Sequence, residues 1–474
     1  MQLADYDLAD FYDEYFVAPG KSRPEVAAIA RWLQTLSPQE LVRHEEAAQQ
    51  TLTELGATFI VDGTKRTLPF DILPRVIAAS EWQQLQLGLK QRVKALNSFC
   101  ADIYGEQRIL RDGKVPREII ESATGFLPNC RGMKPPRGIW CHVSGIDLVR
   151  NQEGQWYVLE DNLRVPSGVA YALKNRQVLQ STLPQLVEQF TLEPVEYYAQ
   201  QLLQSLLNSA PAGISEPTMA VLSPGPQETA YFEHAFLAES IGIALVEPED
   251  LTIADGYLHR LTADGPQRID IIYRRGDVDL LDALHLGDQY ASGSSALIEL
   301  CQQGRLTLAN AMGTGVADDK VVYAYVPEII RYYLGEEPRL PNVPTYLCWQ
   351  SEDRNYVLEH LDQLVVKSAS EYGGSGMLVG PSASQAERDS FADKIRSQPR
   401  NYIAQPTLSL SRIPTVVDGR LEGRHVDLRP YVVSRAEDIY VYPGGLTRVA
   451  LEKGSLVVNS SRGGGTKDTW VLAE

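Results

Sequence analysis

Three oxygen-bearing side chains, Asp147, Glu160 and Asn162, occur within one short stretch of the chain. Two apolar runs flank a polar, glycine-containing turn between them, and this pattern predicts a β-hairpin. Period-two alternation predicts that Glu160 and Asn162 share one side with Trp156 and Val158, with Asp147 opposite on the partner strand. Such a set of oxygen ligands suits Mg²⁺. Taken alone, the hairpin is also compatible with polar residues that merely face solvent.

Two lysines stand beside segments that could hold phosphate. Lys320 follows Asp318 and Asp319, either of which could cap a helix that starts there. Lys367 ends an apolar strand and precedes a glycine-rich loop, in which backbone N–H groups can approach phosphate closely. The loop residues with this predicted role are Gly373, Gly374, Ser375 and Gly376. A solvated helix start and a flexible turn are the alternatives, and a Walker A loop is excluded because the lysine precedes the glycines.

Arginines recur in three clusters near the C-terminus, at 424–431, 444–448 and 459–468. Arginine side chains on strands can bind phosphate or carboxylate with two parallel hydrogen bonds. Arg429 and Arg448 are the candidates for stabilising charge during a reaction. The alternative is an ordinary solvated strand face.

The elements that must position these residues change along the chain. Residues 25–125 are mostly helical in pattern, with a helix start at Ser37-Pro38 and a long amphipathic helix over about 78–104. From about residue 195, strands and helices alternate, which predicts βαβ units and a parallel sheet. The C-terminal third is rich in strands. The predicted fold class is therefore α/β with α+β character.

Composition limits the partners. The net charge is −17, from 44 Lys and Arg against 61 Asp and Glu, which disfavours nucleic acid and anionic membranes. No apolar run approaches roughly 18 residues, so no membrane span is expected. The five cysteines show no CxxC spacing, which disfavours a zinc site or a disulfide framework. The N-terminus lacks the pattern of a signal peptide, and a cytoplasmic location is expected.

The motifs together resemble those of ATP-grasp enzymes. Val-Val-Lys367 before Gly-Gly-Ser-Gly resembles their second nucleotide lysine and phosphate-covering loop, and Ala-Asp-Asp-Lys320 resembles their first lysine. His-Val-Asp-Leu-Arg429 is similar to their Asp-x-Arg strand, and the Asp…Glu-x-Asn hairpin is similar to their metal motif. Here the hairpin precedes the lysines, which resembles the circularly permuted type 2 proteins, relatives of glutathionylspermidine synthetase. The resemblance covers nearly the whole chain, 13–472.

The resemblance implies a fold and a division into domains. The expected fold is a circularly permuted ATP-grasp fold with a Rossmann-like pre-ATP-grasp domain inserted between the metal half and the lysine and glycine-loop half. The expected domains are 1–190, with the N-terminal helical region and the metal half, 191–305, which is the inserted domain, and 306–474, which is the nucleotide-binding half.

The resemblance also implies roles for residues. ATP would contact Lys320, Lys367, the glycine loop and Gln405, and Mg²⁺ would bind at the hairpin. The turn with Arg164, Ser167 and Gly168 would bind substrate. Arg75 and Arg176 are further candidates for a substrate carboxylate, although any of these arginines could instead form a structural ion pair. Lys367, Arg429 and Arg448 would stabilise the transferred phosphoryl group.

The chain departs from the usual ATP-grasp pattern in two places. Gly145 stands where many members have an arginine two residues before the metal aspartate, so Arg429 or Arg448 would have to supply that charge. Gln405 replaces a glutamate common beside the adenine, which leaves the ribose contacts open.

The expected activity is an ATP- and Mg²⁺-dependent carboxylate–amine ligase that acts through an acylphosphate and releases ADP and phosphate. The expected substrates are small-molecule or peptide carboxylates and amines, and a protein partner or a homo-oligomer is possible. Two alternatives remain: a phosphotransferase with the same fold, and an ATP-binding partner protein with little or no turnover.

Overall fold

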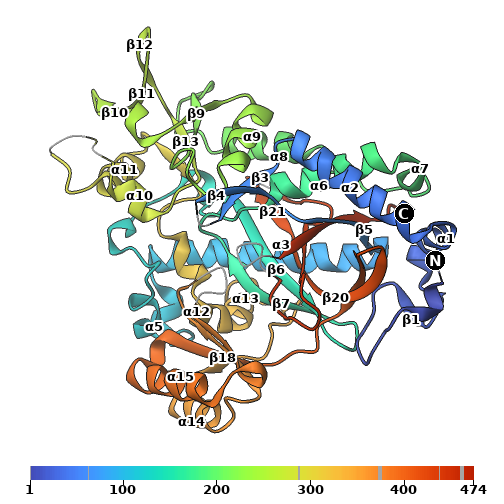
Figure 1. The fold of residues 1–474 in the computed structure, drawn as a ribbon. Helices are drawn as coiled ribbons and strands as arrows, with labels where there is room; N and C mark the ends of the chain where they lie inside the picture. The colour runs from blue at the N-terminus through green and yellow to red at the C-terminus, as the bar shows by residue number, and fades with distance from the viewer. Residues whose placement is uncertain are drawn as a thin grey trace.

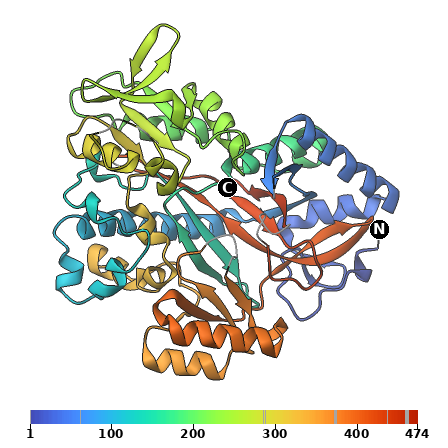
Figure 2. The ribbon, with the colours of Figure 1, turned by 60° about the vertical axis from the view of Figure 1, so that its left-hand side comes forward.

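The structure is a computed structural model, and it describes residues 2–61, 63–284, 286, 289–371, 376–436, 438–458 and 464–474. Within these ranges, a large central sheet lies between two smaller four-stranded sheets, with helices around them (Figure 1). One small sheet is parallel and the other is antiparallel, and they lie on opposite sides of the central sheet (Figure 2). This mixed architecture agrees with the predicted fold class.

The central sheet joins segments that lie far apart in the sequence. Its nine described strands are β5 (Phe70–Ile77), β6 (Val143–Arg150), β7 (Trp156–Asn162), β19 (Arg412–Val417), β20 (Arg420–Arg429), β21 (Tyr431–Ser434), β22 (Ile439–Val441), β23 (Leu446–Val449) and β24 (Gly465–Val471). Their order is β22-β21-β6-β20-β23-β24-β5, with β7 paired to β6 and β19 paired to β20. Strands β24 and β5 are parallel, which ties the end of the chain to its first hundred residues.

The predicted hairpin is present as β6 and β7, but one part of the prediction was wrong. The register pairs Leu148 with Val158 and Asp147 with Glu160, so Leu159 is an extra residue in a β-bulge. Paired residues lie on the same face, so the bulge places Glu160 on the face opposite Val158. Strict alternation fails at this residue, and without the bulge Glu160 would lie on the core face, away from Asp147.

The parallel sheet confirms the predicted βαβ units. Its order is β14-β13-β8-β9, and its strands are β8 (Met219–Leu222), β9 (Ala244–Val246), β13 (Ile271–Arg274) and β14 (Thr307–Ala309). Helix α9 (Tyr231–Ile241) connects β8 to β9. The antiparallel strands β10 (Leu251–Ala254), β11 (Tyr257–Thr262) and β12 (Gly265–Arg268) extend from it. We call residues 219–309 the parallel unit.

The second four-stranded sheet forms a separate lobe, orange in Figure 1. Its order is β15-β18-β16-β17, and its elements are β15 (Tyr346–Leu347), α14 (Ser351–Glu359), β16 (Leu364–Ser368), β17 (Met377–Val379), α15 (Gln385–Ser397) and β18 (Tyr402–Pro406). Its buried apolar residues include a cluster of their own, with Val357, Val366 and Ile395 among them. We call residues 346–406 the small unit.

Helices cover the sheets. Helix α2 (Pro38–Glu54) begins as predicted, with Ser37 and Glu40 in a capping box and proline at the first position. The other described helices of four or more residues are α1 (Ala27–Thr35), α3 (Ala79–Ile103), α4 (Arg108–Arg111), α5 (Arg117–Glu121), α6 (Val169–Thr182), α7 (Pro184–Val187), α8 (Tyr198–Leu207), α10 (Val278–Asp282), α11 (Gly293–Gln302), α12 (Lys320–Ala324) and α13 (Val326–Leu334). Strands β1 (Phe16–Ala18), β2 (Lys21–Ser22), β3 (Thr58–Val61) and β4 (Thr64–Thr67) form two small hairpins. Within the described ranges, none of the helices has the length and apolar character needed to cross a membrane.

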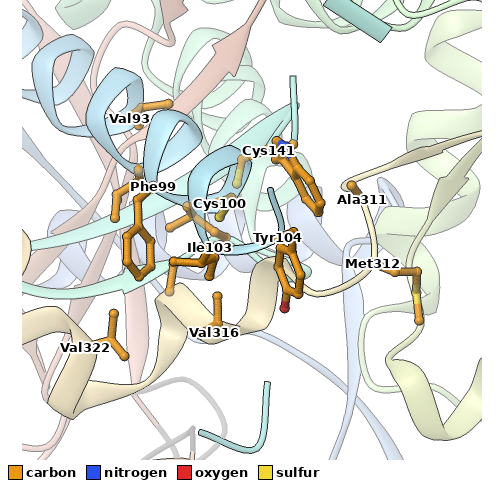
Figure 3. Packing of buried hydrophobic residues seen from close by; sticks show 14 of the residues in the cluster. Val93, Phe99, Cys100, Ile103, Tyr104, Cys141, Ala311, Met312, Val316 and Val322 are labelled. Atoms are coloured by element: carbon orange, nitrogen blue, oxygen red, sulfur yellow. The ribbon is translucent and has the colours of Figure 1, made fainter. Parts of the chain in front are cut away.

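The long helix α3 lies against the segment that carries Lys320. Figure 3 shows Phe99 and Ile103 of α3 near Val316 and Val322, which belong to the same buried cluster. This packing fixes the segment around the start of α12 against α3. The predicted domain boundaries after residues 190 and 305 stay predictions, although β14 completes the parallel sheet just beyond the second of them.

Candidate active site

Asp147, Glu160 and Asn162 lie together on one face of the β6–β7 hairpin. Asp147 is fully buried, whereas Glu160 and Asn162 are partly exposed. The carboxyl groups of Asp147 and Glu160 are close enough for a hydrogen bond. Two carboxylates so close repel each other unless a proton or a cation lies between them. The structure therefore brings the three predicted oxygen ligands to one place.

Two arginines surround the Asp147 carboxylate. Arg429 Nε lies 2.5 Å from Oδ1 and Arg448 Nη2 lies 2.6 Å from Oδ2. Burial alone would raise the pKa of Asp147, but the positive charges of Arg429 and Arg448 hold that pKa well below its usual value. Arg448 also donates from Nε to Asp427 Oδ1 at 2.9 Å, and burial raises the pKa of Asp427 above its usual value. These four side chains form one buried network of alternating charge.

Gly145 explains how Arg429 reaches Asp147. A Cβ atom at Gly145 would lie 3.3 Å from Arg429 Cδ and 3.0 Å from Pro166 Cβ. The side chain of Arg429 thus runs across the space that a larger residue at 145 would occupy. The chain has glycine two residues before Asp147, and an arginine from β20 fills the adjoining space.

Lys320 begins α12 and links the central sheet to the small unit. Asp319 caps the helix by accepting from the backbone N–H groups of Val321 and Val322. Lys320 N donates to Ala369 O at 2.9 Å, and Lys320 Nζ donates to Glu371 O at 2.6 Å. Lys320 Nζ is also 3.8 Å from Glu160 Oε2. The first predicted nucleotide lysine thus lies beside the hairpin carboxylates.

Lys367 approaches the same carboxylates from the small unit. It lies on β16, and its Nζ donates to Gln405 Oε1 on the neighbouring strand β18 at 2.8 Å. Gln405 Nε2 donates to Thr345 Oγ1 at 3.1 Å, which fixes the orientation of the amide. Burial and, to a lesser extent, nearby Lys320 lower the pKa of Lys367 to about 8, although Glu160 opposes this shift.

The glycine-rich loop is only partly described. Gly373, Gly374 and Ser375 lie outside the described residues, so their predicted contact with phosphate stays a prediction. Gly376 has a φ of +60°, and a Cβ there would lie 2.2 Å from Glu371 Oε2. Glycine is therefore required where the loop rejoins β17.

The turn between β7 and α6 holds the predicted substrate residues. Gly168 has a φ of +120°, and a Cβ there would lie 2.3 Å from Tyr431 Oη. Ser167 is partly exposed, and its carbonyl oxygen accepts from Tyr431 Oη at 3.0 Å. Arg164 forms ion pairs with Asp277 and, at 3.6 Å, with Asp318. Arg164 could therefore bind a substrate carboxylate only by exchanging one of these partners.

Arg75 and Arg176 form buried ion pairs instead of lining this turn. Arg75 is fully buried; it donates to both carboxylate oxygens of Glu14 and to the carbonyl oxygen of Asp427. Arg176 pairs with Asp468 at 2.8 Å. This arrangement matches the structural alternative that was left open for both residues, and a substrate contact by either stays a prediction.

Sequence reasoning missed several residues that shape the site. Asp427 and Tyr431 lie within the arginine-containing segment 424–431. Period-two alternation could have placed both side chains on the same side of the strand as Arg429. Glu233 and Arg275 of the parallel unit contact the 166–170 turn. No local pattern marks them, because each acts on a segment more than sixty residues away.

The donor set fits Mg²⁺ through Glu160 and Asn162. The oxygens of Glu160 are no closer than 3.8 Å to the lysine and arginine groups paired with it. Among the described residues none hydrogen-bonds the side-chain amide of Asn162, and the oxygen of that amide is the atom that could bind a cation. A hard cation prefers carboxylate and amide oxygens together with water and phosphate. Among the described residues, no group of three or more His, Cys, Asp or Glu side chains could hold a metal by itself.

Comparison with known families decides the membership of the chain. The model of the family described as circularly permuted ATP-grasp type 2 matches residues 74–450. The chain belongs to this family. The order of its motifs, with the carboxylate hairpin before the two lysines, is the order expected of this family's permuted fold.

Curated relatives cover the chain from end to end. An uncharacterized protein of Synechocystis is 59% identical over 476 residues, covering 100% of this chain and 99% of that protein. An uncharacterized protein of Mycobacterium tuberculosis is 45% identical, covering 99% of this chain and 86% of that protein. A Frankia alni protein named "Putative glutamate--cysteine ligase 2-3" is 44% identical over 97% of this chain, which spans only 54% of that protein.

A solved structure shares the fold. The glutathione synthetase-like effector GSS30 of Globodera pallida, in its apo form, aligns with a TM-score of 0.58 and 12% identity. The alignment covers 92% of this chain and 98% of that protein. At this identity the likeness shows the fold alone.

Proposed function

We propose that this protein is an ATP- and Mg²⁺-dependent carboxylate–amine ligase. The observation that supports this most strongly is the meeting of four cationic side chains with three carboxylates at one site, from the central sheet, α12 and the small unit. The cations are Lys320, Lys367, Arg429 and Arg448, and the carboxylates are Asp147, Glu160 and Asp427. Such a set can offset the charge of a nucleotide triphosphate and of a transferred phosphoryl group.

The proposed reaction has two steps. An oxygen of the substrate carboxylate bonds to the γ-phosphorus of ATP and the bond to ADP breaks, which forms an acylphosphate. The amine then bonds to the acyl carbon, the bond to phosphate breaks, and the departing phosphate takes up the proton that the amine loses. The hairpin residues would hold Mg²⁺, which would supply positive charge to neutralise the phosphates.

Side chains of the protein position and stabilise the reactants in this proposal. Asp147, Glu160 and Asn162 would hold the metal, and Lys320 and Lys367 would bind the α- and β-phosphates. Arg429, held by Asp147, points its remaining donor capacity toward the turn with Ser167, where the substrate carboxylate would lie. Gln405 would orient the adenine end, and the glycine loop would cover the phosphates and exclude water.

The printed names of the relatives support the class of reaction, not its substrates. The Frankia protein with a ligase name is almost twice as long as the segment matched here, so its name assigns no substrate to this segment. We therefore propose a ligase of unspecified carboxylate and amine, in keeping with the conserved architecture of the family.

Product analysis tests the proposal. Purified protein with MgATP is incubated with pools of amino acids, polyamines and small peptides, and ADP and inorganic phosphate are measured. A ligase releases both in equal amounts and only when two co-substrates are present. A carboxylate labelled with ¹⁸O should pass one label to the phosphate. ADP without phosphate would indicate a phosphotransferase, and nucleotide binding without turnover would indicate an ATP-binding partner protein.

The metal assignment is tested separately. Glu160→Ala should slow ATP turnover by roughly 10²–10³-fold, by analogy with other charge-stabilising groups. Asp161→Asn is the matched control, because Asp161 is the next residue on β7 but pairs with Arg92 on the opposite face. Turnover of Glu160→Ala within a few-fold of the wild-type protein would contradict the metal assignment.

A further inference from the structure

The turn with Ser167 is held by two charged side chains of the parallel unit. Glu233 lies on α9 and Arg275 follows β13, and their ion pair joins Arg275 Nη2 to Glu233 Oε1 at 2.8 Å. Their side chains are 0% and 1% exposed. Burying an ion pair costs desolvation energy, so the pair adds little net stability. Its role is therefore better judged from the contacts that the two side chains make with the turn.

Glu233 caps helix α6 from another part of the chain. Its Oε2 accepts from Gly168 N at 2.8 Å and from Ala170 N at 3.0 Å. Gly168 precedes α6 and has no side chain with which to cap it. A carboxylate at a helix N-terminus satisfies free N–H groups and interacts favourably with the helix dipole. Glu233 therefore fixes the end of the turn at the start of α6.

Arg275 fixes the other end of the turn and the Ser167 hydroxyl. Its Nη1 donates to Pro166 O at 2.9 Å, and its Nη2 donates to Ser167 Oγ at 2.8 Å. An arginine can only donate, so the hydroxyl oxygen must accept and its own proton needs another acceptor. Among the described residues, none accepts that proton. Ser167 is partly exposed, so the O–H group is free to donate to a ligand.

The same turn contacts the Asp147 network. The carbonyl oxygen of Ser167 accepts from Arg429 Nη1 at 3.4 Å, and Arg429 forms a bidentate pair with Asp147. A continuous chain of contacts therefore runs from the parallel unit, through the turn, to the proposed site of phosphoryl transfer.

We propose that Glu233 and Arg275 are positioning residues that make Ser167 a dedicated hydrogen-bond donor to the substrate carboxylate. This inference rests on the proposed function for the identity of the ligand, a carboxylate. It assigns to the parallel unit a part in the selection of that substrate, because a carboxylate accepts from Ser167 whereas an ammonium group cannot.

Kinetics tests the role of the hydroxyl. With the carboxylate that supports phosphate release in the pooled assay, Ser167→Ala and Arg275→Met should each raise KM for the carboxylate at least tenfold, with KM for ATP within twofold. KM for the carboxylate in the double variant should be no higher than in the more impaired single variant, because both changes act through one hydroxyl. Arg275→Lys should recover part of the loss. Additive effects, or equal changes in both KM values, would overturn the proposal.

Hydrogen exchange tests the positioning without any substrate. In Glu233→Gln, the amides of the peptide over 166–172 should exchange at least tenfold faster than in the wild-type protein. Asp468→Asn is the matched control, because Asp468 forms a similarly buried pair with Arg176, which also lies on α6. This change should leave the exchange rate of the 166–172 peptide unaltered. Unchanged exchange in Glu233→Gln, or equal acceleration in the control, would contradict the positioning role.

The two failures can be told apart. If the pooled assay finds no carboxylate that supports turnover, the proposed ligase function fails, and the exchange result still decides whether Glu233 positions the turn. If turnover is found and the kinetic pattern is absent, the ligase function stands and the role of Ser167 fails.

Discussion

The central sheet and the small unit hold their parts of the site in different ways. In the central sheet, Asp147, Arg429, Arg448 and Asp427 are interlocked by hydrogen bonds on adjacent strands, and each carboxylate has an arginine partner. In the small unit, the side chain of Lys367 donates to Gln405 of the same unit, at 2.8 Å. One region is fixed by its own charges, whereas the other presents a lysine on a separately packed lobe.

Both polar and apolar contacts join the two regions, since Leu347, Ala369 and Ile403 of the small unit belong to the main buried cluster. Lys320 bonds the backbone of the small unit at Ala369 and Glu371, and Arg400 of the small unit pairs with Asp319 at 2.9 Å. The small unit also has an apolar cluster of its own. We call the network of Asp147, Asp427, Arg429 and Arg448 the floor of the site. We infer that this floor is preorganised and that the small unit can change its distance from it when nucleotide binds.

The largest effect is expected from Asp147→Asn. This change removes the charge that Arg429 pairs with in bidentate fashion and leaves Arg448 paired with Asp427 alone, which should lower the free energy of unfolding by about 3 kcal/mol and the rate of ATP turnover by roughly 10²–10³-fold. Urea denaturation and phosphate release measure the two effects. Asp161→Asn should lower stability comparably while turnover stays within a few-fold. A stable but inactive Asp147→Asn would show that the floor is less interdependent than its contacts indicate.

Lys367→Met should affect turnover without affecting stability. Lys367 is a partly buried cation whose removal relieves a desolvation cost, so the melting temperature should stay the same or rise. ATP turnover should fall by roughly 10²-fold. Lys394→Met, at an exposed position of α15 in the same unit, should change neither quantity. A clear fall in melting temperature for Lys367→Met would remove the contrast with Asp147.

The pH dependence separates the two regions as well. Because the pKa of Lys367 is lowered to about 8, its charge is lost as the pH rises from 7 to 9, and affinity for ATP should fall by about tenfold. Over the same range Asp147 stays ionised, since its pKa is held below its usual value. Titration calorimetry should show proton uptake on binding at pH 8, and Lys367→Arg should flatten the profile.

The lowered pKa of Lys367 also determines how the stability of the folded protein changes with pH. The pKa of Lys367 in the folded protein lies below its unfolded value of about 10.4, so between about 8 and 10 the unfolded chain binds more protons. The contribution of Lys367 to the stability of the nucleotide-free protein should therefore rise with pH across this window. Comparison with Lys367→Met by urea denaturation isolates this contribution.

The smallest effect is expected where the units meet. Arg400→Ala removes the pair with Asp319 and the hydrogen bond to Ile119 O, and it should raise KM for ATP about three- to tenfold with little change in kcat. Hydrogen exchange of β16 should become faster. Arg396→Ala, which breaks an exposed pair with Asp393, is the control and should change neither. Unchanged KM in Arg400→Ala would show that this contact does not hold the small unit to the floor.

Local patterns in the sequence predicted much of the framework. The Ser37 capping box, the long helix α3, the βαβ units and the β6–β7 hairpin all follow from periodicity and capping over a few residues. The lysines Lys320 and Lys367 could be singled out because helix caps and glycine-rich turns are local features. Contacts between segments far apart were not predictable in this way, as with the chain-end pairing of β24 with β5 and the contact of Glu233 with the 168–170 turn.

The sequence by itself determined which residue types are present and which short segments become strands or helices, since those depend on neighbours along the chain. Only the tertiary structure decided that Leu159 forms a bulge, that Glu160 therefore turns to the side of Asp147, and that Arg429 crosses Gly145 to reach it. The physical reason is that strand register and charge pairing are settled by competition among contacts across the whole sheet. The alternation of residues along one strand contains no information about those contacts.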